Sequence, residues 1–598
     1  MTVTFRAAMF TKVLVANRGE IAIRVSRALR EMGIASVAVY SQLDRDALFV
    51  RRADEAYLIG PGPATESYLK IEAILDVAQR SGAQAIHPGY GFLAENAAFA
   101  RACRDAGIAF IGPPAEAIEA MGSKTRAREL MAAAGVPIVP GTTEPVASVD
   151  EARSIIDASI GYPVAVKAAG GGGGKGFRVA LAPGELEAAF EGAAREGEKF
   201  FGDATVYLER YLPDPRHVEV QVLADTHGRV IHLGERDCSV QRRHQKLIEE
   251  APAPAVDAEM RERIGKIATD AAVAVEYVGA GTIEGLLQGG EYFFLEMNTR
   301  VQVEHCVTEM VTGIDIVKEG IRAAAGEPLS IAQDDVVLRG HAIECRINAE
   351  DAAKNFAPAP GRIGAYDEPS GPGVRVDSGV TAGAEITPMY DPMVAKLITW
   401  DIDRDAATRR MLRALDEYEI TGLKTLIPFH RALLATRQWH EAETCRDLVE
   451  DRAWLKQLAF PKDEPTGEED GGAPVEQDYT VEVSGRRFDV KVIGAAPPGA
   501  VANGAAPAAA GARRPPRRER GAGGAGGGGD TLASPLQGTV LKVEVAEGAD
   551  VQEGALICVI EAMKMENEIT AHKAGKVAEL PIAAGGSVAS GDTLAVIK

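Results

Sequence analysis

Residues 531–598 repeat themselves, and this repeat restricts the fold of that part of the chain more than any other sequence feature does. A constant offset of 37 residues relates the two halves, pairing Gly538 with Gly575, Gly548 with Gly585, Val551 with Val588 and Gly554 with Gly591. Two similar halves, each of strand, turn and strand, predict a small all-β sandwich or flattened barrel with pseudo-twofold symmetry.

The segment that joins the two halves is Glu561-Ala-Met-Lys564-Met-Glu566. We expect a tight turn there, with Lys564 exposed at its tip and its amine accessible to a modifying enzyme. An isolated Met-Lys-Met sequence would indicate only a surface lysine. Its position at the centre of a twofold β repeat instead favours a carrier of a prosthetic group.

Residues 494–530 separate this repeat from the rest of the chain. Of these 37 positions, 28 are alanine, glycine or proline, and five arginines against one glutamate and one aspartate leave a charge of +3. Such a segment cannot bury enough apolar surface to fold, so we expect a flexible linker with an r.m.s. reach of roughly 30–35 Å. In the short linking region 456–493, residues alternating about Ser484-Gly485 predict a β-hairpin over 480–492.

The chain begins with an α/β pattern. Two short apolar runs, at 12–17 and 35–40, predict strands, and the helical pattern between them ends at Gly33. We predict a doubly wound α/β domain over 1–120. An α+β domain with strands broken by glycine loops follows over 121–325, and a mixed α+β domain over 326–455 includes a helix at 405–418.

The 598-residue chain carries 86 acidic and 65 basic side chains, a net charge of −21. That charge repels nucleic acid and anionic membranes, so we expect neither as a partner, and small anionic substrates must bind at local clusters of cations. The six cysteines are scattered without metal-ligand spacing, and no apolar run has the length of a membrane helix. We therefore predict a cytoplasmic protein.

The glycine run at 170–176 does not bind nucleotides in either of the common ways. The residues after it read as a strand, whereas a dinucleotide-binding GxGxxG requires a helix, and no Gly-Lys-Ser/Thr ends the run as in a Walker A loop. We predict a strand, a mobile glycine loop and a second strand, whose backbone N–H groups could close over phosphates. The alternative is a plain flexible loop.

Two carboxylates further along the chain indicate a metal site. A three-residue loop at 289–291 would place Glu284 and Glu296 directly opposite each other on antiparallel strands, facing the same side. Two like charges so placed are destabilising unless a cation lies between them, and oxygen ligands suit Mg²⁺ or Mn²⁺. The alternative is a solvated pair on an exposed face, which the apolar residues 292–295 make less favourable.

These pieces resemble the ATP-grasp fold, and the resemblance to biotin carboxylase covers residues 10–455. It rests on Ala16-Asn-Arg-Gly-Glu20, on the glycine run and on segments 87–95, 121–124, 235–246, 296–305 and 344–346. Residues 531–598 resemble a biotinyl carrier domain, since lipoyl domains share that fold but lack methionines on both sides of the lysine. The chain is therefore identified as resembling the fused alpha subunit of a bacterial acyl-CoA carboxylase, with biotin in amide linkage to Lys564.

The resemblance implies a role for each matched residue. The residues that would bind ATP are Lys124, Lys167, Gly173, Gly174, Glu209, Arg210, Tyr211, Leu212, His217, Gln241 and His244. The residues that would hold two Mg²⁺ or Mn²⁺ ions are Glu284, Glu296 and Asn298. The residues that would bind bicarbonate are Lys246, Arg300, Gln302 and Val303. Glu304 would be the general base, and Arg346 would stabilise the enolate-like anion of biotin. Surface salt-bridging is the alternative for Arg300 and Arg346.

The implied reaction uses ATP to convert bicarbonate to carboxyphosphate, whose breakdown yields the CO₂ that biotin takes up. Residues 456–530 are too few for a carboxyltransferase, so a separate subunit would pass the carboxyl group to acetyl-CoA or propionyl-CoA. A biotin-protein ligase would attach the biotin, and the core would be a homodimer within a larger hetero-oligomer. Two alternatives stay open: a subunit of a two-chain pyruvate carboxylase or oxaloacetate decarboxylase, and a carrier or binding protein with an inactive ATP-grasp half.

Two residues depart from the family pattern. Cys306 follows His305 where the family usually has proline, and Gly285 follows Glu284 where it usually has a bulky residue. We expect the first to loosen a loop beside the base and the second to leave a gap near a metal ligand.

Overall fold

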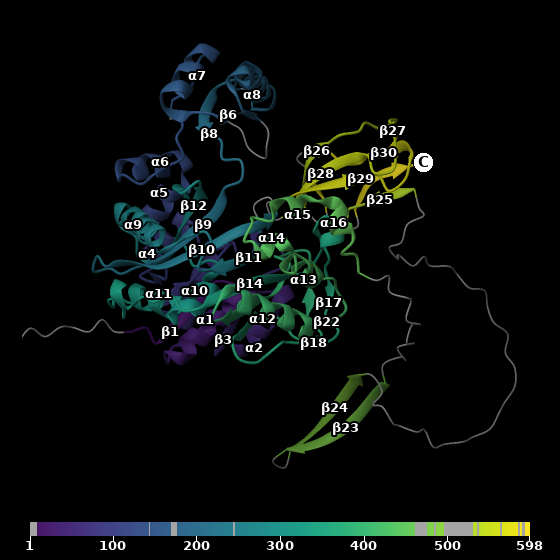
Figure 1. The fold of residues 1–598 in the computed structure, drawn as a ribbon. Helices are drawn as coiled ribbons and strands as arrows, with labels where there is room; N and C mark the ends of the chain where they lie inside the picture. The colour runs from purple at the N-terminus through teal and green to yellow at the C-terminus, as the bar shows by residue number, and fades with distance from the viewer. Residues whose placement is uncertain are drawn as a thin grey trace, which may run out of the picture.

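The computed structural model describes residues 9–142, 144–168, 176–201, 203–242, 245–460, 475–483, 486–494, 530–534, 538–562, 565–583, 586–588 and 592–598. Within this part of the chain, no helix combines the length and apolar character needed to span a membrane. Figure 1 shows one large body, an α/β lobe above it, a separate hairpin and a small β unit at the C-terminal end.

The N-terminal part is a five-stranded parallel sheet in the order β3-β2-β1-β4-β5. Its strands are β1 (Lys12–Val15), β2 (Ala35–Ser41), β3 (Glu55–Gly60), β4 (Ala85–His87) and β5 (Ala109–Phe110). Helix α1 (Gly19–Glu31) connects the first two strands and buries Ile21, Val25 and Leu29 against the core. The predicted strand, helix and strand are thus confirmed.

An eight-stranded antiparallel sheet forms the centre of the large body, in the order β13-β12-β9-β10-β11-β14-β21-β19. One half comprises β9 (Arg216–Ala224), β10 (Val230–Arg242), β11 (Gln245–Ala251), β12 (Gly279–Gln288) and β13 (Glu291–Asn298). The other half comprises β14 (His341–Asn348), β19 (Val374–Ser378) and β21 (Met393–Asp401). Segments predicted as two domains, 121–325 and 326–455, therefore contribute strands to one continuous sheet.

Helices cover this sheet. Helix α9 (Ala258–Ala274) packs on β9 and β10, and α12 (Arg404–Glu417) packs on β14 and β21. Asp403 caps α12, because its side chain accepts a hydrogen bond from the backbone N–H of Ala406. The helix predicted at 405–418 is confirmed with a shift of one residue, and its Met411 and Leu415 are buried as the pattern requires.

The lobe above the body contains a three-stranded sheet, β7-β6-β8, flanked by α7 (Val149–Ile155) and α8 (Leu186–Phe201) (Figure 1). Strands β6 (Val164–Ala168) and β7 (Phe177–Ala180) pair antiparallel, with Lys167 opposite Phe177, and β8 (Val206–Arg210) pairs with β6 on the other side. The two strands predicted around the glycine run are thus confirmed, whereas the loop itself, 169–175, lies outside the described residues.

The predicted hairpin before the linker is confirmed but longer than expected. Strands β23 (Val475–Val483) and β24 (Arg486–Gly494) pair antiparallel along their whole length. Residues 495–529 of the predicted linker lie outside the described residues.

The C-terminal unit consists of two four-stranded sheets, β25-β32-β30-β27 and β29-β28-β26-β31. Their strands are β25 (Thr531–Ala533), β26 (Gly538–Val543), β27 (Asp550–Val551), β28 (Leu556–Ala562), β29 (Met565–Thr570), β30 (Gly575–Glu579), β31 (Ser587–Val588) and β32 (Thr593–Ile597). The offset of 37 residues places β26 on β30, β27 on β31 and β28 on β32, so each sheet is the counterpart of the other. The twofold repeat predicted from the sequence is therefore confirmed.

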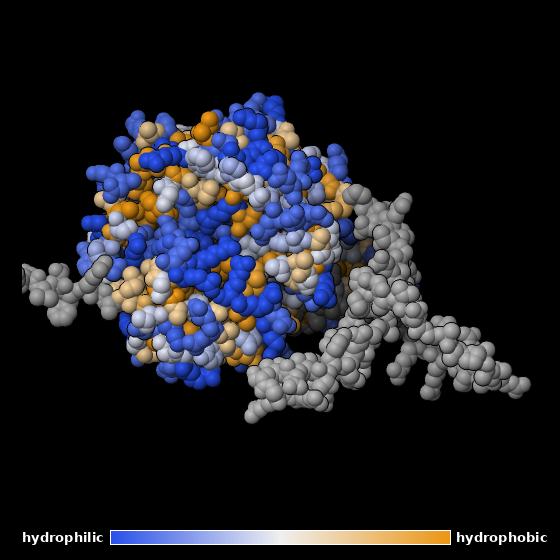
Figure 2. All heavy atoms as spheres, turned by 90° about the horizontal axis from the view of Figure 1, so that it is seen from below, coloured by the Kyte–Doolittle hydropathy of each residue, from blue (hydrophilic) through white to orange (hydrophobic). Residues whose placement is uncertain are grey.

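The joining segment falls between β28 and β29, where Ala562 pairs directly with Met565. Lys564 itself lies outside the described residues. Figure 2, a view from below, shows a mostly hydrophilic face on which the hydrophobic areas are small and scattered.

Candidate active site

A row of three glutamates crosses the large sheet. In β12, Glu284 lies directly opposite Glu296 of β13 and directly opposite Glu219 of β9, so all three side chains project from one face. Glu219 and Glu284 are buried, whereas Glu296 is exposed at the edge of the row. The predicted pairing of Glu284 with Glu296 is confirmed, and the third carboxylate extends it inward.

The turn that creates this pairing differs from the one predicted. Gln288 pairs with Glu291, so the loop consists of Gly289 and Gly290 alone, both with positive φ as such a two-residue turn requires. A two-residue turn by itself would place Glu284 opposite Leu295. A β-bulge between Glu284 and Gly285 shifts the register by one residue and restores the opposition of the two glutamates.

The sequence analysis missed Glu219. The signal that could have found it is the alternation of polar residues His217, Glu219 and Gln221 within the otherwise apolar strand β9. Alternate residues of a strand share a face, so this pattern places three polar side chains on one side of a buried strand.

Lys246 binds three carboxylates of this face at once. Its Nζ lies 2.6 Å from Glu219 Oε2, 2.8 Å from Glu284 Oε1 and 2.8 Å from Glu304 Oε1. Burial alone would lower the pKa of Lys246, but the three carboxylates outweigh it and raise that pKa well above its ordinary value. The lysine is therefore a permanent cation that brings Glu304 next to the glutamate row.

Glu304 is held between two cations. Its Oε1 accepts from Lys246, and its Oε2 accepts a 3.0 Å hydrogen bond from Arg346 Nη2, while Arg346 Nε binds Glu249 at 2.6 Å. Burial would raise the pKa of Glu304, but Lys246 and Arg346 together lower it far below its usual value. The structure thus brings together three of the four predicted catalytic residues, with Glu304 ionised.

The fourth predicted catalytic residue, Arg300, lies next to the glutamate row, where it contacts Asn298. Its Nε donates to Glu95 Oε2 at 2.8 Å and its Nη2 donates to Asn298 Oδ1 at 2.8 Å. Asn298 Nδ2 and Gln302 Nε2 both donate to Glu284 Oε1, at 2.7 and 2.5 Å. Arg300 is therefore linked to Glu284 through Asn298.

The donor set of this face fits a hard divalent cation. Glu284, Glu296 and Asn298 offer two carboxylates and one amide oxygen, which are the ligands that Mg²⁺ and Mn²⁺ prefer. Each side-chain oxygen of Glu284 already lies beside a nitrogen donor or cation, and its pKa is well below the ordinary value because Lys246 and His217 outweigh its burial. Its carboxylate is therefore ionised, as a metal ligand must be.

Arg236 of β10 lies directly opposite Glu219, on the same face of the sheet, and was not among the residues predicted from the sequence. It is fully buried, and its guanidinium binds Glu219 Oε1 at 2.6 Å, Gln302 Oε1 at 2.9 Å and Gln221 Oε1 at 2.8 Å. A guanidinium carries five donors in a rigid fork, so Arg236 orients several acceptors together.

The predicted nucleotide residues are divided between the glutamate row and the lobe. His217 Nε2 lies 2.7 Å from Glu284 Oε2, and Gln241 pairs with Lys246 across β10 and β11. In the lobe, Lys167 forms an ion pair with Glu209, and Arg210 Nη1 reaches Glu291 Oε2 of the body at 3.0 Å.

The remaining nucleotide residues are less completely placed. The ring of Tyr211 lies 6.4 Å from that of Phe177, and Leu212 follows it, just beyond β8. Lys124 opens helix α6 (Lys124–Ala133), and its side chain lies outside the described part of the chain. Gly173, Gly174 and His244 also lie outside the described residues. Val303, predicted to bind bicarbonate, accepts a 2.7 Å hydrogen bond from Lys396 Nζ through its carbonyl.

The two departures from the family pattern do not have the effects we expected. At Gly285 the space that a Cβ would occupy is filled by the ring of Tyr292, so no gap is left beside Glu284. Cys306 is fully buried in the first turn of α10 (His305–Thr312), with its Sγ 3.2 Å from Asp377 Oδ2 and 3.1 Å from Lys396 Nζ. The turn beside Glu304 is therefore tightly packed.

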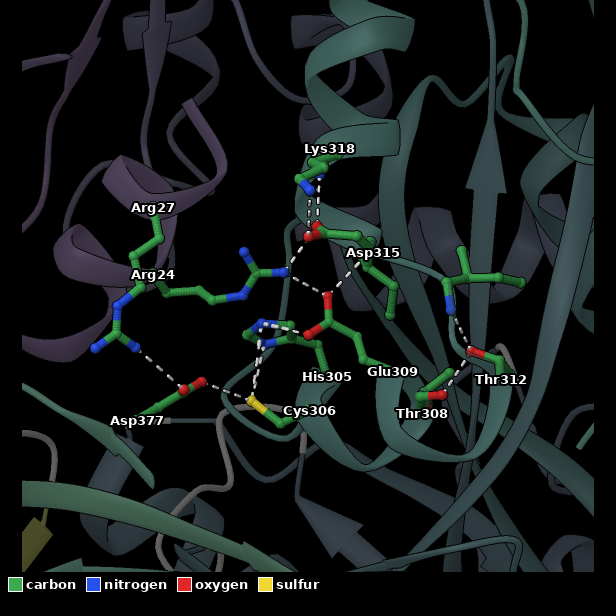
Figure 3. Close-up of polar contacts among 12 residues, drawn as sticks. Arg24, Arg27, His305, Cys306, Thr308, Glu309, Thr312, Asp315, Lys318 and Asp377 are labelled. Atoms are coloured by element: carbon green, nitrogen blue, oxygen red, sulfur yellow. Dashed lines mark hydrogen bonds and ion pairs between the residues drawn. The ribbon is translucent and has the colours of Figure 1, made fainter. Parts of the chain in front are cut away.

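The contacts around Cys306 belong to an interdomain network, which we define as Arg24, Glu309, Asp315, Arg375 and Asp377. Figure 3 shows Arg24 and Arg27 reaching from α1 toward the His305–Glu309 turn and Asp377. Arg24 Nη2 lies 2.8 Å from Glu309 Oε1 and 2.7 Å from Asp315 Oδ1, and Arg375 of β19 binds Glu309 Oε2 at 2.8 Å. The network therefore joins α1, α10 and β19, three segments far apart in the sequence.

Although His305, Cys306 and Glu309 lie close enough together to hold a metal ion, their surroundings disfavour one. Arg24 and Arg375 already neutralise Glu309, and Lys396 lies against Cys306. A second cation would be repelled there, so this cluster is structural.

The class of protein follows from the family models that the chain matches. Residues 123–332 match the family model described as carbamoyl-phosphate synthase L chain, ATP binding domain, and lie between matches to the biotin carboxylase N-terminal domain (9–118) and C-terminal domain (344–451). Residues 530–597 match the model described as biotin-requiring enzyme. The fold and the site are thus those of an ATP-grasp ligase joined to a biotinyl domain.

Individual relatives agree. The biotin-dependent acyl-coenzyme A carboxylase alpha3 subunit of Mycobacterium leprae is 47% identical over an alignment of 606 positions, which covers 98% of each chain. A pyruvate carboxylase subunit of Methanothermobacter thermautotrophicus is 56% identical over 443 residues, 74% of this chain and 90% of that one. The crystal structure of the biotin carboxylase subunit of a pyruvate carboxylase covers 76% of this chain and 100% of its own, with 50% identity and a TM-score of 0.70.

The chain belongs to the biotin carboxylase family and carries its own biotinyl carrier domain. The cofactors that accompany these domains are biotin, ATP and Mg²⁺ or Mn²⁺. The resemblance and the fold class predicted from the sequence are confirmed.

Proposed function

We propose that this protein carboxylates biotin held on its own Lys564, using ATP and bicarbonate, and that a separate carboxyltransferase subunit passes the carboxyl group to acetyl-CoA or propionyl-CoA. The observation that carries the carboxylation step is the position of Glu304, ionised and held between Lys246 and Arg346 beside the glutamate row. The full-length likeness to an acyl-CoA carboxylase alpha subunit supports the wider assignment.

The anion-binding residues give this face its chemistry. Lys246, Arg300 and Gln302 offer nitrogen donors, which now contact Glu304, Asn298 and Glu284 respectively, and a small anion such as bicarbonate binds where such donors converge. The carbonate-type oxygens would replace carboxylate oxygens as partners of Lys246 and Arg300. Once the anion takes up the charge of Lys246, the pKa of Glu304 rises toward its ordinary value, and Glu304 can accept a proton.

Two metal ions would bind at the glutamate row. Glu284, Glu296 and Asn298 would hold them, and Lys246 and His217 would move away from Glu284 as they bind. The ions would neutralise the phosphate charge of ATP. Lys124, Lys167, Gly173 and Gly174 would contact the phosphates, and Glu209, Arg210, Tyr211, Leu212, Gln241 and His244 would line the rest of the nucleotide.

Arg346 would face the biotin. Its guanidinium is fixed at Nε by Glu249 and at Nη2 by Glu304, and a fixed cation can stabilise negative charge that develops on a bound ring oxygen. The linker over 494–530 would allow the carrier to visit this site and the carboxyltransferase in turn. A biotin-protein ligase would load Lys564, and the carboxylase core would form a homodimer within a larger hetero-oligomer.

A second candidate is the biotin-bearing subunit of a two-chain pyruvate carboxylase. The likeness to the Methanothermobacter pyruvate carboxylase subunit, and to the biotin carboxylase subunit of a pyruvate carboxylase, favours it over the front three quarters of the chain. The two candidates share the carboxylation step and differ only in the partner subunit and the acceptor. The chain that co-purifies on an avidin column, and the acceptor it carboxylates, separate them.

The test of the proposed function uses the full chain and three measurements. We expect bicarbonate-dependent ATP hydrolysis that free biotin stimulates, retention of the holoprotein on avidin, and loss of that retention in Lys564→Arg with the free-biotin activity intact. Lys573→Arg, in the same domain, is the matched control and keeps avidin binding. A wild-type chain without biotin-stimulated hydrolysis would overturn the carboxylase proposal, and avidin retention by Lys564→Arg would overturn the carrier site.

A further inference from the structure

Behind Arg346 lie two buried glutamates: Glu249, which binds its Nε, and Glu344, which has no role in the site described so far. Glu249 of β11 and Glu344 of β14 lie directly opposite each other in an antiparallel pair, and both are fully buried. Directly opposite residues project from the same face of a sheet, so the two carboxyl groups share one buried space. Arg346 follows Glu344 by two residues and therefore lies on the same face of β14.

These carboxyl groups are incompletely satisfied. Glu249 Oε1 accepts the 2.6 Å hydrogen bond from Arg346 Nε, but Glu249 Oε2 and both carboxyl oxygens of Glu344 are buried without a hydrogen-bond partner. A buried carboxylate without donors is costly, and such a group is stabilised by taking up a proton. Two carboxyls facing each other in one buried space then retain at least one proton between them.

The charged groups around the pair come from every neighbouring segment. Lys396 faces Glu344 from β21, where it lies directly opposite Arg346, and Lys246 and Glu304 face Glu249. The thiols that interact with the pair are those of Cys238, Cys306 and Cys345. Burial raises the pKa of Glu249 to about 7 against the opposing charge of Arg346, and it raises the pKa of Glu344 well above its ordinary value against Lys396.

We propose that Glu249 and Glu344 hold one proton between them and together position Arg346, with Glu249 ionised toward the guanidinium and Glu344 protonated behind it. The proposal rests on the proposed function, since it concerns the residue that would face biotin. With one proton, Arg346 divides its donors between Glu249 and Glu304. With no proton, a third negative charge draws the guanidinium away from Glu304, and with two protons Nε loses its anchor.

This arrangement makes the two glutamates unequal, and that inequality can be measured. In Glu249→Gln, the anchor of Nε becomes a neutral amide, so we expect the kcat with free biotin to fall at least tenfold while the KM for ATP stays within twofold. In Glu344→Gln, the amide imitates the protonated carboxyl. We therefore expect kcat at pH 7 within about threefold of wild type, and an alkaline limb of the kcat profile that moves to higher pH.

Glu250→Gln is the matched control. Glu250 is the next residue of β11, equally buried, but it binds His341 and Arg404 instead of Arg346. Its amide variant tests what a neutral side chain in this strand does to folding alone, and we expect the wild-type pH profile from it.

Four outcomes decide the proposal. The proposal is supported if Glu249→Gln loses much more activity than Glu344→Gln, as described above. It is overturned if the two variants lose equal activity, or if both keep the wild-type pH profile. If one variant fails to fold, the infrared difference spectrum between the wild-type chain and the other variant still decides. Replacing either carboxyl should change a buried protonated carboxyl band at neutral pH, and an unchanged band overturns the proposal. A wild-type chain without biotin-stimulated ATP hydrolysis would instead overturn the proposed function.

Discussion

Two buried charge clusters meet at helix α10, which begins at His305 directly after Glu304, and they are built differently. In the interdomain network, Arg24 and Arg375 neutralise Glu309, and Arg375 also binds Asp377 at 2.7 Å. Burial would raise the pKa of Glu309, but these cations lower it to about 2. In the cluster around Lys246 and Arg346, which we call the carboxylate cluster, Glu219, Glu249, Glu284, Glu304 and Glu344 compete for too few cations.

This difference in charge balance distinguishes a cluster that stabilises the fold from a cluster that can bind ligands. In the interdomain network every carboxylate contacts at least two cations: Glu309 contacts Arg24 and Arg375, Asp315 contacts Arg24 and Lys318, and Asp377 contacts Arg375 and Arg27. Such a network is balanced without a ligand and holds α1, α10 and β19 together. The carboxylate cluster contains more carboxylates than cations. Its negative charge is balanced only when it binds further cations or takes up protons, as a metal-dependent ligase requires. Helix α10 touches both, since Glu304 precedes its first residue and Glu309 lies one turn further on.

The largest effect should come from neutralising the base. In Glu304→Gln the carboxylate that accepts the proton is lost, and the single amide oxygen can accept a hydrogen bond from only one of Lys246 and Arg346 in the present geometry. We therefore expect biotin carboxylation to fall by about 10²–10⁴-fold. The measurement is fixation of labelled bicarbonate onto free biotin, with thermal unfolding as the control for folding. A variant with more than a tenth of the wild-type rate would show that Glu304 is not the base.

Next in size is the loss of a charge from the interdomain network. Removing one partner of a buried ion pair typically costs about 3–5 kcal/mol when the other partner is left uncompensated. Glu309→Gln removes the buried carboxylate that Arg24 and Arg375 share, but Asp315 and Asp377 still bind these arginines, so we expect a cost toward the lower end of that range. We expect a lower midpoint of urea unfolding with an unchanged rate per folded molecule. Asp315→Asn is the control, since Asp315 is about one-third exposed and should cost far less. Equal midpoints for the two variants would contradict the distinction between the clusters.

The sequence predicted most of the fold because its signals were local or periodic. The repeat predicted the carrier sandwich, and the spacing of Glu284 and Glu296 predicted their pairing. The bulge between Glu284 and Gly285 could not be predicted, because the alternation of polar and apolar residues reveals a bulge only when the length of the turn is already known. Glu219 and Arg236 were missed because their importance comes from strands far apart in sequence, and the glutamate pair behind Arg346 depends on the register of β11 against β14.

The smallest predicted effect is a difference in how the two clusters respond to pH. Burial lowers the pKa of His305, beside Glu309, to about 3, so between that pH and 6.5 the unfolded chain binds more protons than the folded one. The contribution of His305 to stability is therefore complete above pH 6.5 and declines as the pH falls. Glu344 has the opposite sign: its raised pKa makes its contribution complete below about pH 4.5 and lost as the pH rises through the folded value.

These opposite signs can be read from urea midpoints between pH 4 and pH 8. Relative to wild type, His305→Gln should lose less stability on acidification, whereas Glu344→Gln should gain relative stability as the pH rises. Parallel pH curves for the two variants would mean that both clusters titrate alike. Curves of opposite slope would mean that the interdomain network is most stable near neutral pH, whereas the carboxylate cluster is most stable while Glu344 keeps its proton.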